Sequence, residues 1–210
     1  MRFIAFSDFH GAEYKYKNAK TIVNEINELK QLDFIVICGD LTTRGSILEA
    51  QSLLKLADFP VDTYFVFGNM DYFDNINQNL ENANNIHLDP IKIEDYDLIG
   101  IGGDRQDIKQ DIKAAKNIIS NLKSKFLVLI THVAPYMHCD IAYNNSHIGS
   151  KHLTDLIKDI QKEKNILVCC GHVHEQWTCN AKLGNAEIWN VGPNGILFEL
   201  DDFKIKAQLL

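Results

Sequence analysis

The sequence predicts an α/β fold, and two patterns along the chain support this prediction. Short apolar runs of strand length alternate with longer segments whose apolar residues recur at helical spacing. The final forty residues lack helical spacing and indicate antiparallel strands added at the C-terminal end. At 210 residues the chain has a length typical of one domain, so we expect a single domain over residues 1–210.

The first half of the chain alternates strands with helices. Apolar runs predict strands at 2–7, 34–38 and 63–67. The second of these runs is apolar throughout, which is typical of a strand covered on both faces. Ile22, Ile26 and Leu29 lie at helical spacing and predict a helix over 12–31. Further helices are expected at 46–57 and, from a weaker pattern that ends in an asparagine-rich stretch, at 72–81.

The pattern changes after Pro90. Apolar residues at 91–93 and 98–101 flank a polar turn, which predicts a hairpin. Helical spacing returns over 106–122 and 150–163. Two more buried strands are expected at 126–131 and 166–170. The C-terminal strands are expected at 178–182, 187–191, 196–200 and 204–209, because polar turn residues separate these runs.

Charge and cysteine content narrow the function classes. The net charge is −7 with eight histidines counted neutral, which argues against a broad surface for nucleic acid or anionic membrane. It leaves open a small anionic substrate held by a local positive centre. No apolar stretch approaches the ~18 residues of a membrane span, and no leader pattern is seen. The five cysteines form no CxxC pair, so we expect no disulfide framework or zinc clip, and a cytoplasmic setting.

Polar residues follow five of the predicted buried strands. The five motifs are Ser7-Asp8-Phe9-His10, Gly39-Asp40, Gly68-Asn69-Met70-Asp71, Thr131-His132 and Gly171-His172-Val173-His174. Each motif alone is weak, although alternate histidines in an extended segment can chelate a metal. Ligands bind beyond the carboxyl ends of strands in α/β sheets, so we expect the five motifs to converge on one site.

These side chains suit divalent metals. Imidazole and carboxylate groups bind zinc, iron, manganese, cobalt and nickel. Two such ions, set against the charges of Asp8 and Asp40, leave a net charge of about +2 that attracts phosphate. A metal pair can clamp the attacking and leaving oxygens of an in-line displacement and generate hydroxide near neutral pH. The pattern therefore predicts a two-metal hydrolase.

With these motifs the sequence resembles the calcineurin-like metallophosphoesterases, whose pattern is D-x-H, GD, GN-H-D/E, H and GH-x-H. The resemblance runs from Asp8 to His174, and the segment 190–193 is similar to the family's Asn-Pro-Gly turn. It implies a two-sheet β-sandwich flanked by helices, in four αββα layers. It also implies two divalent ions that activate a hydroxide for phosphoester hydrolysis, with manganese the first choice and iron, nickel, cobalt or zinc as alternatives.

The resemblance also implies roles for individual residues. Asp8, His10 and His174 would hold one ion, and Asp40 would bridge both. The second ion would be held by the remaining three matched positions, Asn69, His132 and His172. Asn69 and His132 would also help to neutralise the oxygens of the reacting phosphate.

One position departs from the family pattern. Met70 stands where much of the family has a histidine that stabilises the phosphoryl transition state and protonates the leaving oxygen. A thioether cannot donate a proton. Family members without this histidine lean towards phosphodiesters, so we expect a phosphodiesterase. Asp71, which would normally orient that histidine, either holds a supporting hydrogen bond or donates a proton itself.

Substrate contacts and alternative functions stay open. Arg44, Arg105 and His138 lie near the motifs in the sequence, and each could contact a small phosphoester. One alternative is a phosphomonoesterase that acts on nucleotides or phosphoproteins. Another is a scaffold of the same fold that has lost catalysis, although all seven ligand positions of the pattern are present.

Overall fold

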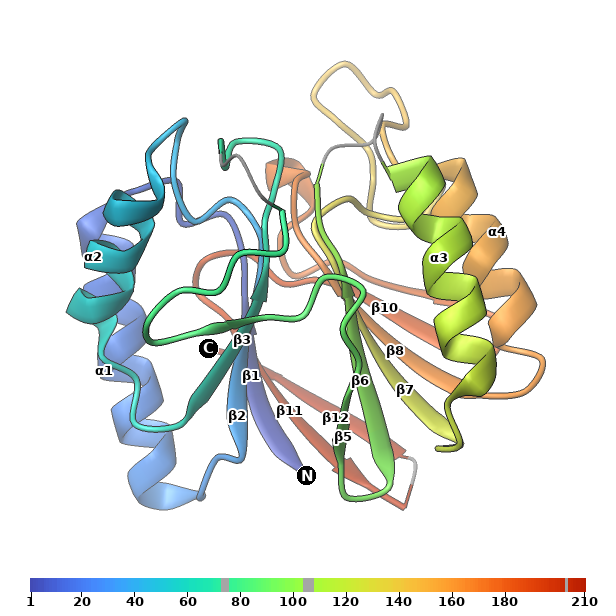
Figure 1. Cartoon of the computed structure of the whole chain (residues 1–210), viewed down its shortest axis with the longest axis horizontal. Coiled ribbons are helices and arrows are strands. Elements are labelled where there is room, and N and C mark those ends of the chain that lie inside the picture. The colour runs from blue at the N-terminus through green and yellow to red at the C-terminus, as the bar shows by residue number, and fades with distance from the viewer. Residues whose placement is uncertain (73–75, 104–107, 203) are drawn as a thin grey trace.

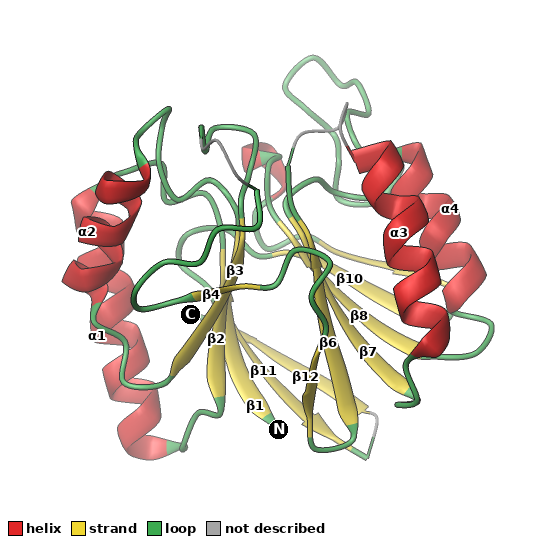
Figure 2. Cartoon of the chain, viewed as in Figure 1, coloured by secondary structure: helices red, strands yellow, loops and turns green. Residues whose placement is uncertain are grey.

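The computed structural model describes residues 1–72, 76–103, 108–202 and 204–210. In these residues two six-stranded sheets face each other, and helices cover their outer faces (Figure 1). Helices α1 (Glu13–Leu29) and α2 (Ile47–Ala57) cover the first sheet. Helices α3 (Ile108–Asn121) and α4 (Lys151–Ile160) cover the second (Figure 2). The layers run helix, sheet, sheet, helix, as expected for this fold class.

The first sheet has the strand order β12-β11-β1-β2-β3-β4. Its strands are β1 (Arg2–Phe6), β2 (Phe34–Cys38), β3 (Asp62–Val66), β4 (Asn84–Asn85), β11 (Ile196–Asp201) and β12 (Lys204–Leu209). Strands β1, β2 and β3 are parallel, whereas β11 is antiparallel to β1. The carboxyl ends of β1, β2 and β3 therefore lie at one edge of the sheet.

The second sheet has the strand order β5-β6-β7-β8-β10-β9. Its strands are β5 (Ile91–Ile93), β6 (Tyr96–Ile101), β7 (Phe126–Thr131), β8 (Asn165–Cys170), β9 (Asn180–Leu183) and β10 (Ala186–Asn190). Strands β6, β7, β8 and β10 are parallel to one another. Their carboxyl ends also share one edge, next to that of the first sheet (Figure 1).

Each central strand is buried on both faces, which explains the continuous apolar runs. In β1, Ile4 and Phe6 pack with α1 and α2, whereas Phe3 and Ala5 pack between the two sheets. Successive side chains of a strand point to opposite faces, so one strand contributes to two layers of core. The second sheet is built in the same way, with Leu129 facing the helices and Val128 facing the other sheet.

The predicted helix over 72–81 is wrong. Residues 73–75 lie outside the described part of the chain, and residues 76–80 form turns and a bridge from Leu80 to Ala83. Asparagine side chains bond to the backbone here instead. Asn79 accepts from the backbone N–H of Asn85 at 2.7 Å, and the Asn85 amide donates to the carbonyl of Ile76 at 2.6 Å. Such bonds compete with those of a helix.

The sequence predicts no disulfide framework, but the described residues contain one disulfide that was not expected. Cys139 and Cys179 form a disulfide between the loop after β7 and the segment before β9. The two residues are 40 positions apart, and no local spacing motif signals a pair that only the fold brings together. The cysteine pattern therefore no longer supports a reducing compartment. The other cysteines, Cys38, Cys169 and Cys170, are free and buried in strands.

The helices of the described residues are short or amphipathic. None of them is long and apolar enough to cross a lipid bilayer, and the longest, α1, carries charged residues along its length.

Candidate metal centre

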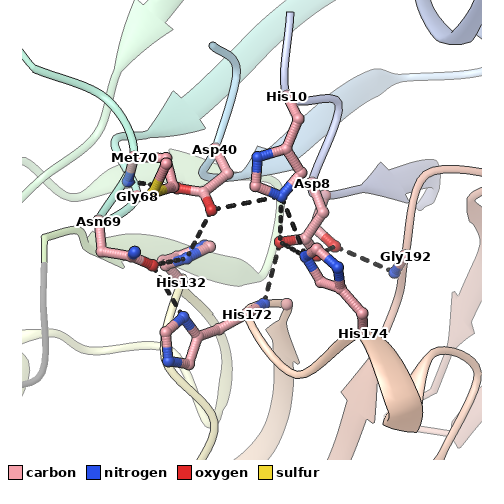
Figure 3. A network of polar contacts seen from close by, with 12 residues as sticks. Asp8, His10, Asp40, Gly68, Asn69, Met70, His132, His172, His174 and Gly192 are labelled. Carbon is pink, nitrogen blue, oxygen red and sulfur yellow. Dashed lines mark hydrogen bonds and ion pairs between the residues drawn. The ribbon is translucent and has the colours of Figure 1, made fainter. Parts of the chain in front are cut away.

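Loops from both sheets meet at the shared edge of the sandwich (Figure 3). They follow β1, β2 and β3 of the first sheet and β7 and β8 of the second. The structure brings together all the side chains that the sequence motifs assign to a metal site: Asp8, His10, Asp40, Asn69, His132, His172 and His174. The predicted convergence of the five strand ends is thus present in the fold.

One group of potential ligand atoms consists of Asp8, His10 and His174. The Nε2 atoms of the two histidines are 3.0 Å apart. Oδ1 of Asp8 lies 3.9 Å from Nε2 of His10 and 3.6 Å from that of His174. Ligands about 2.0–2.2 Å from one ion would be separated by distances of about this size. The geometry therefore fits one divalent ion between the three side chains.

A second group centres on Asp40. Its Oδ2 lies 3.4 Å from Nε2 of His132 and 3.6 Å from Nε2 of His10. One carboxylate oxygen thus lies between histidines of the two halves of the site (Figure 3). Oδ1 of Asn69 is 2.8 Å from both Nε2 of His132 and Nδ1 of His172. Asp8, Asp40 and His132 form a second group of potential ligand atoms, and Asp40 also lies within 3.6 Å of His10 from the first group.

The backbone is strained at four of these residues. The φ angles of Asp8, His10, Asp40 and His172 are 58°, 53°, 53° and 71°, in the left-handed region that residues other than glycine rarely adopt. Each such residue costs of the order of 1–3 kcal/mol and persists where the surroundings over-determine it, often at functional sites. The tight turns after the strands direct these side chains to one place.

Glycines in the motifs make room for the ligands. A Cβ atom on Gly68 would overlap the carboxylate of Asp40, and one on Gly39 would lie 2.6 Å from Nδ1 of His132. Gly39 also has a φ of 84°. The glycine before Asp40 and the glycine before Asn69 are therefore required for close packing and not only for a turn.

Several residues support the site without belonging to the predicted ligand set. The hydroxyl of Ser7 donates to Oδ2 of Asp8 at 2.5 Å, and Nε1 of Trp177 donates to the same oxygen at 3.3 Å. Nζ of Lys15 donates to the backbone carbonyl of Asp8 at 2.7 Å. Trp177 lies 169 positions from Asp8 and Lys15 lies seven, and neither belongs to a strand-end motif, so spacing alone gives no signal for them.

The backbone also fixes the state of His132. Its Nδ1 lies 2.9 Å from the carbonyl oxygen of Cys38, a pure acceptor, so Nδ1 carries the proton and donates. That tautomer leaves Nε2, which faces Asp40 and Asn69, as the ligand atom when the ring is neutral.

The two carboxylates stay ionised in spite of their burial. Burial opposes the charge of Asp8, but His174, His132 and Ser7 outweigh it and hold the pKa of Asp8 well below its usual range. Burial is likewise outweighed at Asp40, whose pKa is lowered chiefly by His132. Burial lowers the pKa of His132, but the charge and hydrogen bonding of Asp40 raise it to about 9. In the metal-free chain, a proton on His132 thus balances negative charge that a cation would otherwise balance.

Asp71 joins the backbone of two loops. Its oxygens accept from the N–H groups of Leu41, Thr42 and Gly68 and from the hydroxyl of Thr42. Burial raises the pKa of Asp71 to about 6, although these hydrogen bonds oppose the shift. Both carboxylate oxygens are used in this way, which favours the supporting role over proton donation.

The three proposed substrate contacts differ in placement. Arg44 is exposed, with its guanidinium 5.8 Å from the ring centre of Tyr72, and its backbone N–H donates to the carbonyl of Met70 at 2.8 Å. It therefore lies beside the Met70 loop. His138 is half-buried in the loop after β7, where Nδ1 is 2.8 Å from the carbonyl of Tyr136. Arg105 lies outside the described residues.

The sequence profile of the calcineurin-like phosphoesterases matches residues 1–176, which include every ligand position of the site. The chain belongs to the calcineurin-like phosphoesterase family. Membership implies metal-dependent phosphoester hydrolysis, and the clustered oxygen and imidazole ligands fit divalent ions in this phosphoesterase. The identity of the metal does not follow from these ligands, because they suit several ions.

Relatives match this phosphoesterase over nearly its whole length. An uncharacterized protein of Methanocaldococcus jannaschii, MJ1162, is 30% identical over 97% of each chain. Among solved structures, TT1561 of Thermus thermophilus has a TM-score of 0.63 at 17% identity and covers 99% of this chain and 98% of its own. GAP50, described as the anchor in the inner membrane complex of Plasmodium, has a TM-score of 0.72 at 14% identity over 100% and 84% of the two chains. The structural likenesses support the fold.

Proposed function

We propose that this phosphoesterase hydrolyses phosphodiesters with two divalent ions held at the cluster of Asp8, His10, Asp40, Asn69, His132, His172 and His174. The observation that carries the two-ion part is the position of Oδ2 of Asp40, within 3.6 Å of histidines from both halves of the cluster. Bound there, the ions would attract the phosphate and lower the pKa of a water molecule that attacks phosphorus.

The chain's own residues prepare the site for that chemistry. Asp8 and Asp40 stay ionised and supply negative charge that would retain the cations. The carbonyl of Cys38 accepts from Nδ1 of His132, which leaves Nε2 as the ligand atom once the ring is neutral. Asn69 directs Oδ1 towards His132 and His172, and the amide nitrogen of its side chain can donate to an oxygen of the substrate.

Met70 supports diesters over monoesters. Its backbone N–H donates to Oδ1 of Asp40 at 2.8 Å, so the residue lies directly beside the bridging carboxylate (Figure 3). Its thioether cannot protonate a leaving oxygen or stabilise the extra charge of a monoester dianion. A diester carries one negative charge less, so its hydrolysis should slow less than that of a monoester when that proton donor is absent. Arg44, beside Met70, is proposed to attract the anionic substrate, and we retain His138 and Arg105 as predicted contacts.

Hydrolysis of bis(4-nitrophenyl) phosphate with added manganese tests this function. We expect activity in the wild-type chain and its loss in Asp40→Ala and His132→Ala. The exposed residues Asp155 and His152 on α4 provide matched controls, and their alanine variants should keep full activity. Full activity in both Asp40→Ala and His132→Ala would overturn the mechanism.

A second comparison separates the proposed function from its rivals. The purified chain is assayed on bis(4-nitrophenyl) phosphate and 4-nitrophenyl phosphate with manganese, nickel, cobalt and zinc in turn. A higher kcat/KM for the diester supports the proposal, whereas a higher value for the monoester supports a phosphomonoesterase. Fewer than one bound ion per chain, with no activity on either substrate, would favour a scaffold without catalysis.

A further inference from the structure

Trp177 contacts two of the residues in the Asp8, His10 and His174 group. Its Nε1 donates to Oδ2 of Asp8 at 3.3 Å. Its ring lies 4.8 Å from the ring of His174, with the two planes inclined at 32°. A single side chain thus touches the carboxylate and one imidazole of the same candidate ion position. The side chain of His174 is otherwise well exposed, at 45%.

The indole occupies a fitted place in the fold. A Cβ atom on Gly192 would lie 2.8 Å from Cγ of Trp177, so only glycine leaves room for the ring there. The backbone N–H of Gly192 donates at 3.0 Å to the hydroxyl of Ser7, which itself donates to Oδ2 of Asp8. On another side, Nζ of Lys15 lies 5.6 Å from the indole centre while it donates to the Asp8 carbonyl.

The turn that carries Trp177 is tied to the rest of the molecule. The residue directly follows the short 3-10 helix η1 (His174–Gln176), and its backbone N–H donates to the carbonyl of His174 at 3.4 Å. The next N–H, of Thr178, donates to the carbonyl of Asn190 at 2.7 Å. Cys179 then bonds to Cys139 in the loop after β7. The backbone at Trp177 is therefore held in place by hydrogen bonds and a nearby disulfide.

These contacts assign a separate task to each oxygen of Asp8. Oδ2 accepts from both Ser7 and Trp177, which uses its lone pairs. Oδ1 is the oxygen that lies 3.9 Å from Nε2 of His10 and 3.6 Å from that of His174, and it also accepts from the N–H of His172 at 3.2 Å. The hydrogen bonds to Oδ2 thus turn Oδ1 towards the ion position.

We propose that Trp177 is a positioning residue that orients Asp8 and His174 for the ion they share with His10. Residues that hold metal ligands in place typically contribute about 10–100-fold to metal affinity. The inference rests on the proposed metal centre and adds a named residue to it. Loss of the indole N–H would let the Asp8 carboxylate rotate, and loss of the ring would also free the His174 imidazole.

Zinc binding to the metal-free chain, measured by competition with a chromophoric chelator, tests the inference. Trp177→Phe removes the N–H and keeps a ring, whereas Trp177→Leu removes both. We expect Trp177→Phe to lower the affinity for one of the two zinc ions about 10–100-fold and to leave the affinity for the other within about twofold of wild type. Trp177→Leu should lower the affinity for the same ion at least as much.

The chain offers a matched control in its other tryptophan. Nε1 of Trp189 donates to a carboxylate oxygen of Glu187 at 2.9 Å, outside the metal cluster. Trp189→Phe should therefore bind both zinc ions as the wild type does. It also leaves Trp177 as the sole tryptophan, because the sequence has two. The fluorescence of Trp177 in this variant should change when the zinc ion beside Asp8 and His174 binds.

The outcomes separate this inference from the proposed function. Two zinc ions bound with wild-type affinity in both Trp177→Phe and Trp177→Leu would overturn the positioning role and leave the metal centre intact. A wild-type chain that binds no zinc would overturn the metal centre and the inference with it. Ser7→Ala removes the second bond to Oδ2 of Asp8, and it should weaken the same ion even where Trp177→Leu fails to fold.

Discussion

Thr42 donates two hydrogen bonds to Oδ1 of Asp71, from its backbone N–H at 2.8 Å and from its hydroxyl at 3.1 Å. The other oxygen of Asp71 accepts from the N–H of Leu41 at 3.2 Å and of Gly68 at 2.9 Å. The carboxylate of Asp71 thus joins the loop that carries Asp40 to the loop after β3. The position of Asp40 depends on this connection between the two loops.

We expect Asp71→Ala to destabilise the fold and weaken the metal centre. Alanine has no acceptor oxygen, so the N–H groups of Leu41, Thr42 and Gly68 would lose their partner. Leaving such buried groups unpaired costs about 1–3 kcal/mol. Urea unfolding of the metal-free chain measures the loss, and Asp62→Ala, at the exposed start of β3, is the control. Unchanged stability in Asp71→Ala would contradict the connection between the two loops.

Restoring the family histidine should change substrate preference. Met70→His places a proton donor beside Asp40, and we expect the ratio of monoester to diester kcat/KM to rise by at least about tenfold, since proton transfer typically contributes 10²–10⁴-fold. The ratio is measured on the two nitrophenyl substrates with manganese. Met70→Gln, which also introduces a polar side chain but cannot donate an acidic proton, should leave the ratio near the wild-type value. Equal ratios in all three chains would remove the reason to favour diesters.

Metal binding should release a proton from His132. Burial lowers the pKa of this imidazole, but Asp40 raises it overall to about 9, whereas a metal ligand must be neutral. Below pH 9 the metal-free chain therefore holds a proton that the ion displaces. We expect the logarithm of the zinc association constant to rise by about one per pH unit between about pH 6.5 and 8 from this group alone. Calorimetry in buffers of different ionisation enthalpy counts the protons, and a pH-independent affinity would contradict this assignment.

The raised pKa of His132 also makes the stability of the fold depend on pH. A histidine whose folded pKa is raised stabilises the native state fully below its unfolded pKa of about 6.5, and this contribution is lost as pH rises through about 9. Adding zinc should therefore stabilise the chain more at pH 8.5 than at pH 6.5, at equal free zinc. Thermal unfolding at the two pH values measures this difference.

The disulfide should stabilise the chain by closing a loop. Cys139 and Cys179 are 40 positions apart, and a link of that span is worth about 4 kcal/mol in the chain-entropy description. Denatured protein should titrate as three free thiols, and as five after reduction. We expect the double variant Cys139→Ser, Cys179→Ser to unfold at lower urea concentration. Five thiols before reduction, or equal stability of the two chains, would contradict the link.

Strand positions followed from the sequence where both faces of a strand are buried. The continuous apolar runs of β2 and β7 located these strands to the residue. Strand β6 begins earlier than expected, at Tyr96, because the polar Asp97 is buried and accepts from the N–H of Ser124 at 3.1 Å. A polar residue satisfied by a distant loop gives no local strand signal. Around Asn85 the error is the reverse, because the sequence predicts a helix at 72–81 where asparagine side chains bond to the backbone instead.

The candidate site followed from the sequence as a set of residues but not as a geometry. Asp40 and His132 are polar residues that follow apolar runs. Strand formation does not require them, so the sequence identifies both as members of the cluster. The left-handed backbone at Asp8 and the contact of Trp177 with Asp8, 169 positions away, depend on the complete fold. Residues that support ligands across such distances leave no periodic or spacing pattern.

Electron paramagnetic resonance during manganese titration of the metal-free chain tests the two-ion centre most directly. Oδ2 of Asp40 lies between histidines of both halves, so two ions would be about 3.5–4 Å apart and magnetically coupled. We expect two manganese ions per wild-type chain with a spin-coupled spectrum, and loss of the coupling in Asp40→Ala. Saturation with one ion per chain, or two ions without coupling, would contradict the bridging place of Asp40.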